Sequence, residues 1–148
     1  MISTTSEHAL RSLVRLARLP KGETLLGKRL AQEAEVPANY LSKILWTLGN
    51  AGLVSATRGS GGGYYLQKDP REIFLIDVIE LFDGIRARPR CLLGEKSPCS
   101  DGDPCSAHNA WREVRRRYIN FLETTTLAQI ATSPESQGEA TAGAQTPE

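Results

Sequence analysis

The chain has 148 residues, of which 40% are hydrophobic, so it suits one domain with a real core and a modest appendage. No apolar run approaches the roughly 20 residues of a membrane-spanning helix, and the N-terminus lacks the regions of a signal peptide, so we expect a cytoplasmic protein without a membrane partner. The net charge is +1, but the charges are unevenly distributed, since residues 1–68 hold nine basic and four acidic residues. The N-terminal half is therefore the better candidate for binding a polyanion.

Apolar residues recur at helical spacing in three segments near the N-terminus. Residues 6–19 carry them at i, i+3, i+4 and i+7, with arginines on the other side, which predicts an amphipathic helix. A short helix over 26–34 and a third helix over 38–51 follow, separated by a turn at Pro37. Two short helices across a tight turn form a helix-turn-helix candidate.

The next segments predict a β-hairpin and a buried helix. Residues 53–57 and 64–66 are typical of short strands, and the glycine-rich residues 58–63 between them suit a turn. Residues 74–82 are mostly apolar, which favours a short helix that stops at Gly84. A hairpin directly after the third helix would form the wing of a winged helix-turn-helix.

A long final helix is predicted from residues 104 to 125. Its larger side chains are spaced alternately by three and four, which suits pairing with a second helix, so we expect a dimer interface here. These positions are Trp111, Val114, Tyr118, Phe121 or Leu122, and Thr125. The fold class is therefore mainly α with a small β-hairpin wing, plus a long C-terminal dimerisation helix.

Four regions follow from these elements. The polar last stretch lacks large apolar residues and is predicted to be a disordered tail. The regions are a winged helix-turn-helix DNA-binding domain over 1–84, a cysteine-rich loop over 85–107, a dimerisation helix over 108–131 and the tail over 132–148.

The start of the second helix of a helix-turn-helix reaches base edges in the major groove of double-stranded DNA. The residues nominated there are Asn39, Tyr40, Ser42 and Lys43. Asn can pair with adenine, and Lys with phosphate or guanine.

In the wing, glycines such as Gly61 and Gly62 let the backbone approach the duplex, and Arg58 suits a narrow minor groove. The alternative is a winged helix that serves only as a scaffold between proteins, with its basic residues in solvent.

All three cysteines, Cys91, Cys99 and Cys105, lie in one Gly- and Pro-rich stretch, and His108 follows directly. A reducing compartment and an odd count disfavour disulfides, so metal or redox chemistry is the better interpretation. Asp103 and Pro104 resemble the cap and first residue of a helix, which would place Cys105 and His108 one turn apart on one face. Basic residues upstream, at Arg86, Arg88 and Arg90, would offset the charge of thiolate ligands.

Soft sulfur ligands suit either of two centres. Zinc would take three cysteines and a histidine tetrahedrally, and an iron-sulfur cluster would take the cysteines with another fourth ligand. Spacing alone does not choose between them. A structural zinc site and three unligated thiols are the plainer alternatives, and a histidine just after a helix start is often only a surface residue.

Four segments together resemble the Rrf2 family of winged-helix regulators, over about residues 1–131. They are EHALRSLVRLARLP, PANYLSKIL, TRGSGGGYYL and CLLGEKSPCSDGDPCSAHNAW. The resemblance implies a homodimer in which three cysteines hold a 2Fe-2S or 4Fe-4S cluster close to the partner's first helix. Some members use as fourth ligand a histidine just after the third cysteine, which matches His108. Others use an acidic residue near the N-terminus of the partner, which matches Glu7.

The resemblance pairs His108 with a 2Fe-2S site and Glu7 with a 4Fe-4S site. At Ser42 the chain departs from those members that carry Glu there and use it to choose between promoter types, so target preference does not transfer.

The resulting hypothesis is a homodimeric regulator whose affinity for its operator depends on an iron-sulfur cluster. Its rivals are a winged-helix DNA binder with a zinc site and an iron-sulfur carrier or assembly protein. We expect neither an enzyme nor a small-molecule substrate, since the sequence shows no Ser/His/Asp arrangement, and its glycine run lacks the context and the Lys of a phosphate loop.

Overall fold

The computed structural model describes residues 2–87, 91–94 and 99–132. It begins with three helices, α1 (Thr4–Ala17), α2 (Gly27–Glu33) and α3 (Ala38–Asn50), whose bounds lie within two residues of the predicted ones. At the start of α1, the Ser3 hydroxyl caps the helix by accepting a hydrogen bond from the Ser6 backbone N–H at 3.1 Å. The buried faces of the three helices pack together in the main core.

The predicted wing is confirmed as an antiparallel hairpin of β1 (Val54–Thr57) and β2 (Gly63–Leu66). The turn between the strands requires glycine at position 62, because a Cβ there would lie 2.4 Å from the carbonyl oxygen of Thr57. The hairpin is also tied to the segment before α2. Leu25 and Tyr64 exchange two backbone hydrogen bonds of 3.0 and 2.8 Å, so the wing has a fixed place beside the helix-turn-helix.

Helix α4 (Leu75–Asp83) joins two parts of the core. Val78 packs in the main core with α1 and α3, while Ile76 and Ile79 form a second cluster with Leu122. The helix ends at Gly84, as the sequence predicts, and the φ of this glycine is 55°, in the left-handed region.

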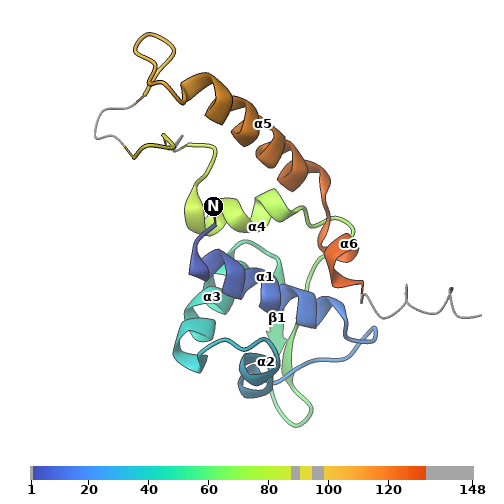
Figure 1. Ribbon diagram of the computed structural model, residues 1–148. Helices are drawn as coiled ribbons and strands as arrows, with labels where there is room; N and C mark the ends of the chain where they lie inside the picture. The colour runs from blue at the N-terminus through green and yellow to red at the C-terminus, as the bar shows by residue number, and fades with distance from the viewer. Residues whose placement is uncertain (1, 88–90, 95–98, 133–148) are drawn as a thin grey trace, which may run out of the picture.

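The last two helices are α5 (His108–Thr124) and α6 (Leu127–Ala131). The predicted start of α5 at Pro104 is wrong, because α5 is preceded by Ala107 as its N-cap. The physical reason is a tight turn in which Ser100 and Asp103 pair through their backbones, so Asp103 does not cap a helix. Figure 1 shows α5 lying along α4, with the cysteine-bearing segment at its N-terminal end and α6 at the other.

Helix α6 is not predicted by the periodicity. It starts with a capping box, in which Thr126 accepts from the Gln129 backbone and the Gln129 side chain accepts from the Thr126 backbone. The helix packs on α1, and the Arg18 guanidinium donates to the Ala131 carbonyl at 2.8 Å. This contact holds the end of α6 against α1.

Two predictions concern residues outside those described: the disordered tail beyond Thr132, and the roles of Arg88 and Arg90. Within the described ranges, no helix is both long enough and apolar enough to cross a membrane.

Candidate functional site

The sulfur atoms of Cys91, Cys99 and Cys105 converge at the N-terminal end of α5, all within 4.8 Å of one another. The sulfur atoms of Cys91 and Cys105 are 3.6 Å apart. Two thiolates on one tetrahedral zinc or iron would be about 3.8 Å apart, given metal–sulfur bonds of about 2.3 Å. The three predicted cysteines are therefore placed where one metal centre can reach all of them.

His108 lies beside this triad, although not by the predicted route. Cys105 precedes α5, so the expected pairing of Cys105 and His108 along one helical face is wrong. Instead the His108 ring places its Nδ1 atom 3.0 Å from the sulfur of Cys99. The same sulfur accepts the Cys105 backbone N–H at 3.3 Å, which holds the turn before α5 around it.

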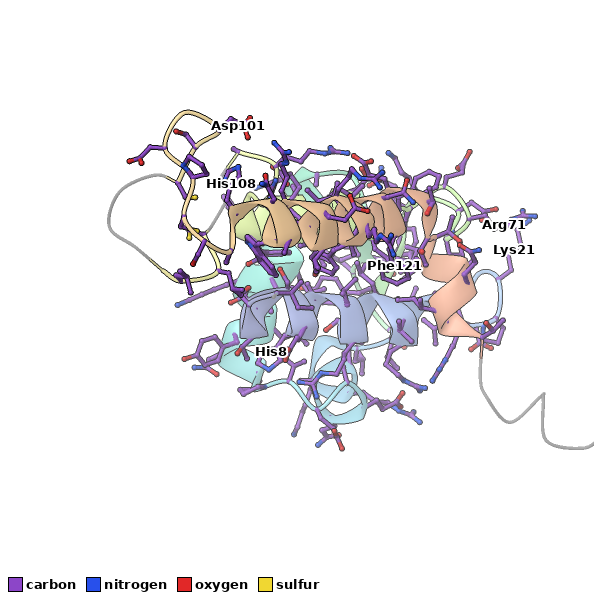
Figure 2. All side chains as sticks on the ribbon, turned by 45° about the horizontal axis from the view of Figure 1, so that its top comes forward. His8, Lys21, Arg71, Asp101, His108 and Phe121 are labelled. Carbon is purple, nitrogen blue, oxygen red and sulfur yellow. The ribbon has the colours of Figure 1, made fainter. Side chains whose placement is uncertain are left out.

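On its other side the His108 ring meets Asp101, a residue that the sequence argument missed (Figure 2). The Oδ1 atom of Asp101 lies 2.9 Å from His108 Nε2 and 2.6 Å from Arg112 Nη1. The hydrogen bond from His108 and the charge of Arg112 lower the pKa of Asp101. In the sequence, Asp101 could be noticed only as an acidic residue inside the cysteine loop, because no periodic spacing relates it to His108.

A cavity of about 300 Å³ lies against these side chains. Its wall includes the three cysteines, His108 and, from α5, Trp111 and Arg115. Burial is the largest cause that raises the pKa of the Cys105 thiol, and the neighbouring sulfurs add to it. A cationic metal centre would favour the Cys105 thiolate, which burial otherwise disfavours.

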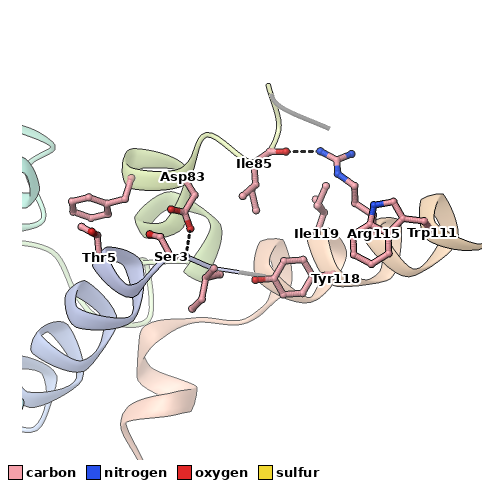
Figure 3. A pocket seen from close by; sticks show the side chains of 10 residues that line it. Ser3, Thr5, Asp83, Ile85, Trp111, Arg115, Tyr118 and Ile119 are labelled. Atoms are coloured by element: carbon pink, nitrogen blue, oxygen red, sulfur yellow. Dashed lines mark hydrogen bonds between the residues drawn. The ribbon is translucent and has the colours of Figure 1, made fainter. Parts of the chain in front are cut away.

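A second cavity of about 550 Å³ lies between the start of α1, the end of α4 and α5 (Figure 3). At its edge the Asp83 carboxylate accepts hydrogen bonds from the Ser3 backbone N–H and the Ser6 hydroxyl, both at 2.9 Å. Arg115 donates to the carbonyl of Ile85. Because Trp111 and Arg115 line both cavities, the cysteine site is connected to the contact between α4 and α1.

Two predicted participants lie apart from the sulfur triad. Glu7 is exposed in the first turn of α1, and the metal-ligand group found among the described residues does not include it. The side chain of Arg86 donates a hydrogen bond to Glu123 of α5 at 2.6 Å, so it connects the segment after α4 to α5.

The four residues nominated on α3 are exposed, whereas Leu41, Ile44, Leu45 and Leu48 of the same helix are buried. The Ser42 hydroxyl donates to the carbonyl of Ala38 at 3.1 Å, and the Tyr40 and His8 rings pack at an angle of 61° with their centroids 6.4 Å apart. Trp46, which was not nominated from the sequence, is 72% exposed on the same helix. The available signal in the sequence was that Trp46 lies outside the helical spacing of the apolar residues Leu41, Ile44, Leu45 and Leu48.

In the wing, the predicted contact residues differ in exposure. Arg58 and Gly61 are exposed, whereas Gly62 is buried in the turn.

The model of the Rrf2 family, described as "Iron-dependent Transcriptional regulator", matches residues 2–133. This chain belongs to the Rrf2 family. It is 34% identical over 106 residues to the HTH-type transcriptional regulator IscR of Klebsiella pneumoniae (strain 342), a match that covers 72% of this chain and 64% of that protein.

Two solved structures extend the likeness to the fold. CymR, the global cysteine regulator of B. subtilis, has a TM-score of 0.71 and 28% identity, covering 88% of this chain and 95% of that one. IscR of T. potens has a TM-score of 0.73 and 25% identity, covering 96% of this chain and 93% of that one. The Rrf2 chain is thus a winged-helix, DNA-binding transcriptional regulator and not an enzyme, and its clustered cysteines could hold a metal or a cluster.

Proposed function

We propose that this Rrf2 protein is a homodimeric transcription regulator in which Cys91, Cys99 and Cys105 hold an iron-sulfur cluster that controls affinity for a DNA operator. The observation that carries the proposal is the convergence of the three sulfur atoms within 4.8 Å, in a chain whose family is described as iron-dependent. A protein that binds its operator acts where the DNA is, so we place its action in the cytoplasm.

The donor set fits a 2Fe-2S or 4Fe-4S cluster. Thiolates are the usual ligands of such clusters, and imidazole replaces some of them in known centres. His108 offers an imidazole beside the triad, and Glu7 of a partner subunit remains the other proposed fourth ligand. When bound, a cluster supplies chemistry that responds to iron supply, redox stress or nitric oxide.

The chain's own contacts support a route from the cysteine site to the DNA-binding domain. Trp111 and Arg115 on α5 border the site, and Arg115 donates a hydrogen bond to the carbonyl of Ile85, which follows the end of α4. The end of α4 is bonded to the start of α1 through Asp83 and Ser6. Since α1 packs on α3 and β2, a shift of the loop against α5 can change how the reading elements are held.

The dimer is proposed to form through α5. Val114 and Phe121 are 49% and 51% exposed and lie seven residues apart, which places them along one side of the helix. Two such helices would bury these side chains against each other.

On DNA, α3 is proposed to enter the major groove. Asn39 would pair with adenine, Lys43 would contact phosphate or guanine, and Tyr40 and Ser42 would complete the contact. The wing would bring Arg58, with Gly61 and Gly62 in its turn, to the neighbouring minor groove.

A second candidate is a winged-helix DNA binder with a structural zinc site. The four donors Cys91, Cys99, Cys105 and His108 favour it, because zinc in structural sites takes four such ligands. An iron-sulfur carrier has less support, since a carrier does not need the helix-turn-helix and wing.

The test is anaerobic purification, followed by a visible spectrum and by iron, sulfide and zinc analysis. We expect a coloured protein with iron and sulfide, and we expect Cys99→Ser to lose the colour while the matched variant Ser106→Ala keeps it. A colourless protein that carries zinc would replace the cluster by the zinc site. A fully coloured Cys99→Ser protein would remove Cys99 from the ligands.

A further inference from the structure

The two ring nitrogens of His108 face different partners. Nδ1 lies 3.0 Å from the sulfur of Cys99, and Nε2 lies 2.9 Å from Oδ1 of Asp101 (Figure 2). The His108 side chain is 14% exposed, while Asp101 is 78% exposed, so the ring is enclosed and its carboxylate partner lies at the rim.

This arrangement determines which nitrogen carries the proton. An ionised carboxylate only accepts hydrogen bonds, so Nε2 must be the donor to Asp101. In a neutral imidazole the other nitrogen then presents its lone pair, and that nitrogen, Nδ1, faces the sulfur of Cys99.

Arg112 holds the carboxylate in place. It lies four residues after His108, one turn further along the same face of α5, and donates to the same oxygen of Asp101 at 2.6 Å. Asp101 thus connects the cysteine loop to two side chains of α5. Histidines that bind metals commonly donate their second N–H to a carboxylate, which fixes the ring orientation and raises the basicity of the ligand.

We propose that Asp101, held by Arg112, is a positioning residue that directs Nδ1 of His108 to the cysteine triad as the fourth ligand. This inference rests on the proposed iron-sulfur function and goes beyond it. It assigns the ligand atom, gives a role to two residues outside the ligand set, and selects His108 over Glu7.

The first test measures nitrogen coordination directly. The protein is labelled with ¹⁵N-histidine, loaded anaerobically, reduced and examined by pulsed EPR. The chain has two histidines, and we expect one strongly coupled nitrogen that disappears in His108→Ala and persists in His8→Ala. In Asp101→Ala we expect the coupling to change or vanish, while Asp103→Ala, an exposed acidic residue of the same loop, leaves it unchanged.

The second test measures retention of the cluster against a chelator. Loss of the hydrogen-bond partner behind a metal-bound histidine lowers metal affinity about 10–100-fold. We therefore expect faster cluster loss by a factor in this range in Asp101→Ala, a smaller acceleration in Arg112→Ala, and none in Asp103→Ala.

The outcomes separate the inference from the function on which it rests. Iron and sulfide without a strongly coupled histidine nitrogen would overturn the role of Asp101 and leave a cluster regulator with another fourth ligand. Equal coupling and equal retention in Asp101→Ala and Asp103→Ala would also overturn it. A protein without iron and sulfide would overturn the proposed function and this inference together.

Discussion

Ser6 is the buried polar side chain that connects the start of α1 to the end of α4. Its side chain has no exposure, and its hydroxyl donates to Asp83 at 2.9 Å. A hydrogen bond to a charged group in such a position contributes more to stability than one at the surface. This contact lies on the proposed route between the cysteine site and the DNA-binding domain.

Ser6→Ala should lower the free energy of unfolding by about 1–2 kcal/mol, because the carboxylate of Asp83 loses one of its donors. Urea denaturation measures this change, and Thr4→Ala, at an exposed position of the same helix, is the matched control. If both variants unfold at the same urea concentration, the Ser6 contact does not hold α1 to α4.

At the residue scale, the candidate metal ligands could be predicted from the sequence, but their surroundings could not. Three cysteines and a histidine within one short segment are rare enough to be noticed, and the structure brings them together. Asp101 was missed because its role depends on a turn that returns it to His108. Such a contact has no signature in local spacing.

Helix α5 has two different apolar positions side by side. Leu122 is 2% exposed and packs with Ile76 and Ile79 of α4, whereas Phe121 is 51% exposed. The first side chain belongs to the core of one subunit, and the second is available for the proposed dimer. Substitutions at these two adjacent positions can therefore test the stability of the subunit and the formation of the dimer separately.

Leu122→Ala should lower the free energy of unfolding by about 2–5 kcal/mol, because it leaves a cavity between α5 and α4. Phe121→Ala should weaken the dimer and leave the thermal unfolding of a dilute monomer within about 0.5 kcal/mol of the parent. Sedimentation and calorimetry distinguish the two effects. A Phe121→Ala protein that dimerises as tightly as the parent would contradict the proposed interface.

Glu113 on the same helix accepts hydrogen bonds from Arg116 and Arg117, at 2.9 and 2.8 Å. The hydrogen bonds from Arg116, the larger cause, and from Arg117 lower the pKa of Glu113 from 4.5 to about 2. The ionised form is thus favoured in the folded state, so this contribution to stability is complete above pH 4.5. It is lost as the pH falls through about 2.

Carbon-13 NMR of the Glu113 carboxyl should give a midpoint near this pKa, and replacing Arg116 and Arg117 together by Ala should move it upward. Arg29→Ala, on α2, is the control that should leave it unchanged. A midpoint at the ordinary pKa of glutamate in the parent would show that these contacts do not persist in solution.

Among the elements, the long helices and the hairpin follow from periodicity and from glycine positions, so their predictions are confirmed within a few residues. The start of α5 was wrong because the pairing of Ser100 with Asp103 competes with capping. Helix α6 has only five residues, too few for a periodic pattern, although its capping box was visible in the sequence.

At the scale of the whole molecule, the cysteine site and the wing lie at opposite ends of the fold (Figure 1). In the proposed regulator, a cluster at the first end would not contact DNA bound at the second, so its influence would pass through α5, α4 and α1 or through the proposed dimer. Two recognition helices read half-sites about one helical turn apart, so a change in their separation alters affinity. A difference of about 1.4 kcal/mol between two arrangements changes affinity tenfold.

The most direct test of this account compares the affinity of cluster-loaded and cluster-free protein for DNA. Duplexes are selected from a random pool separately with each form, and fluorescence anisotropy then gives Kd for both forms on the same duplex at fixed salt. We predict Kd values that differ more than tenfold, with Cys99→Ser matching the cluster-free form. Equal Kd values for the two forms on every selected duplex would contradict control of DNA binding by the cluster.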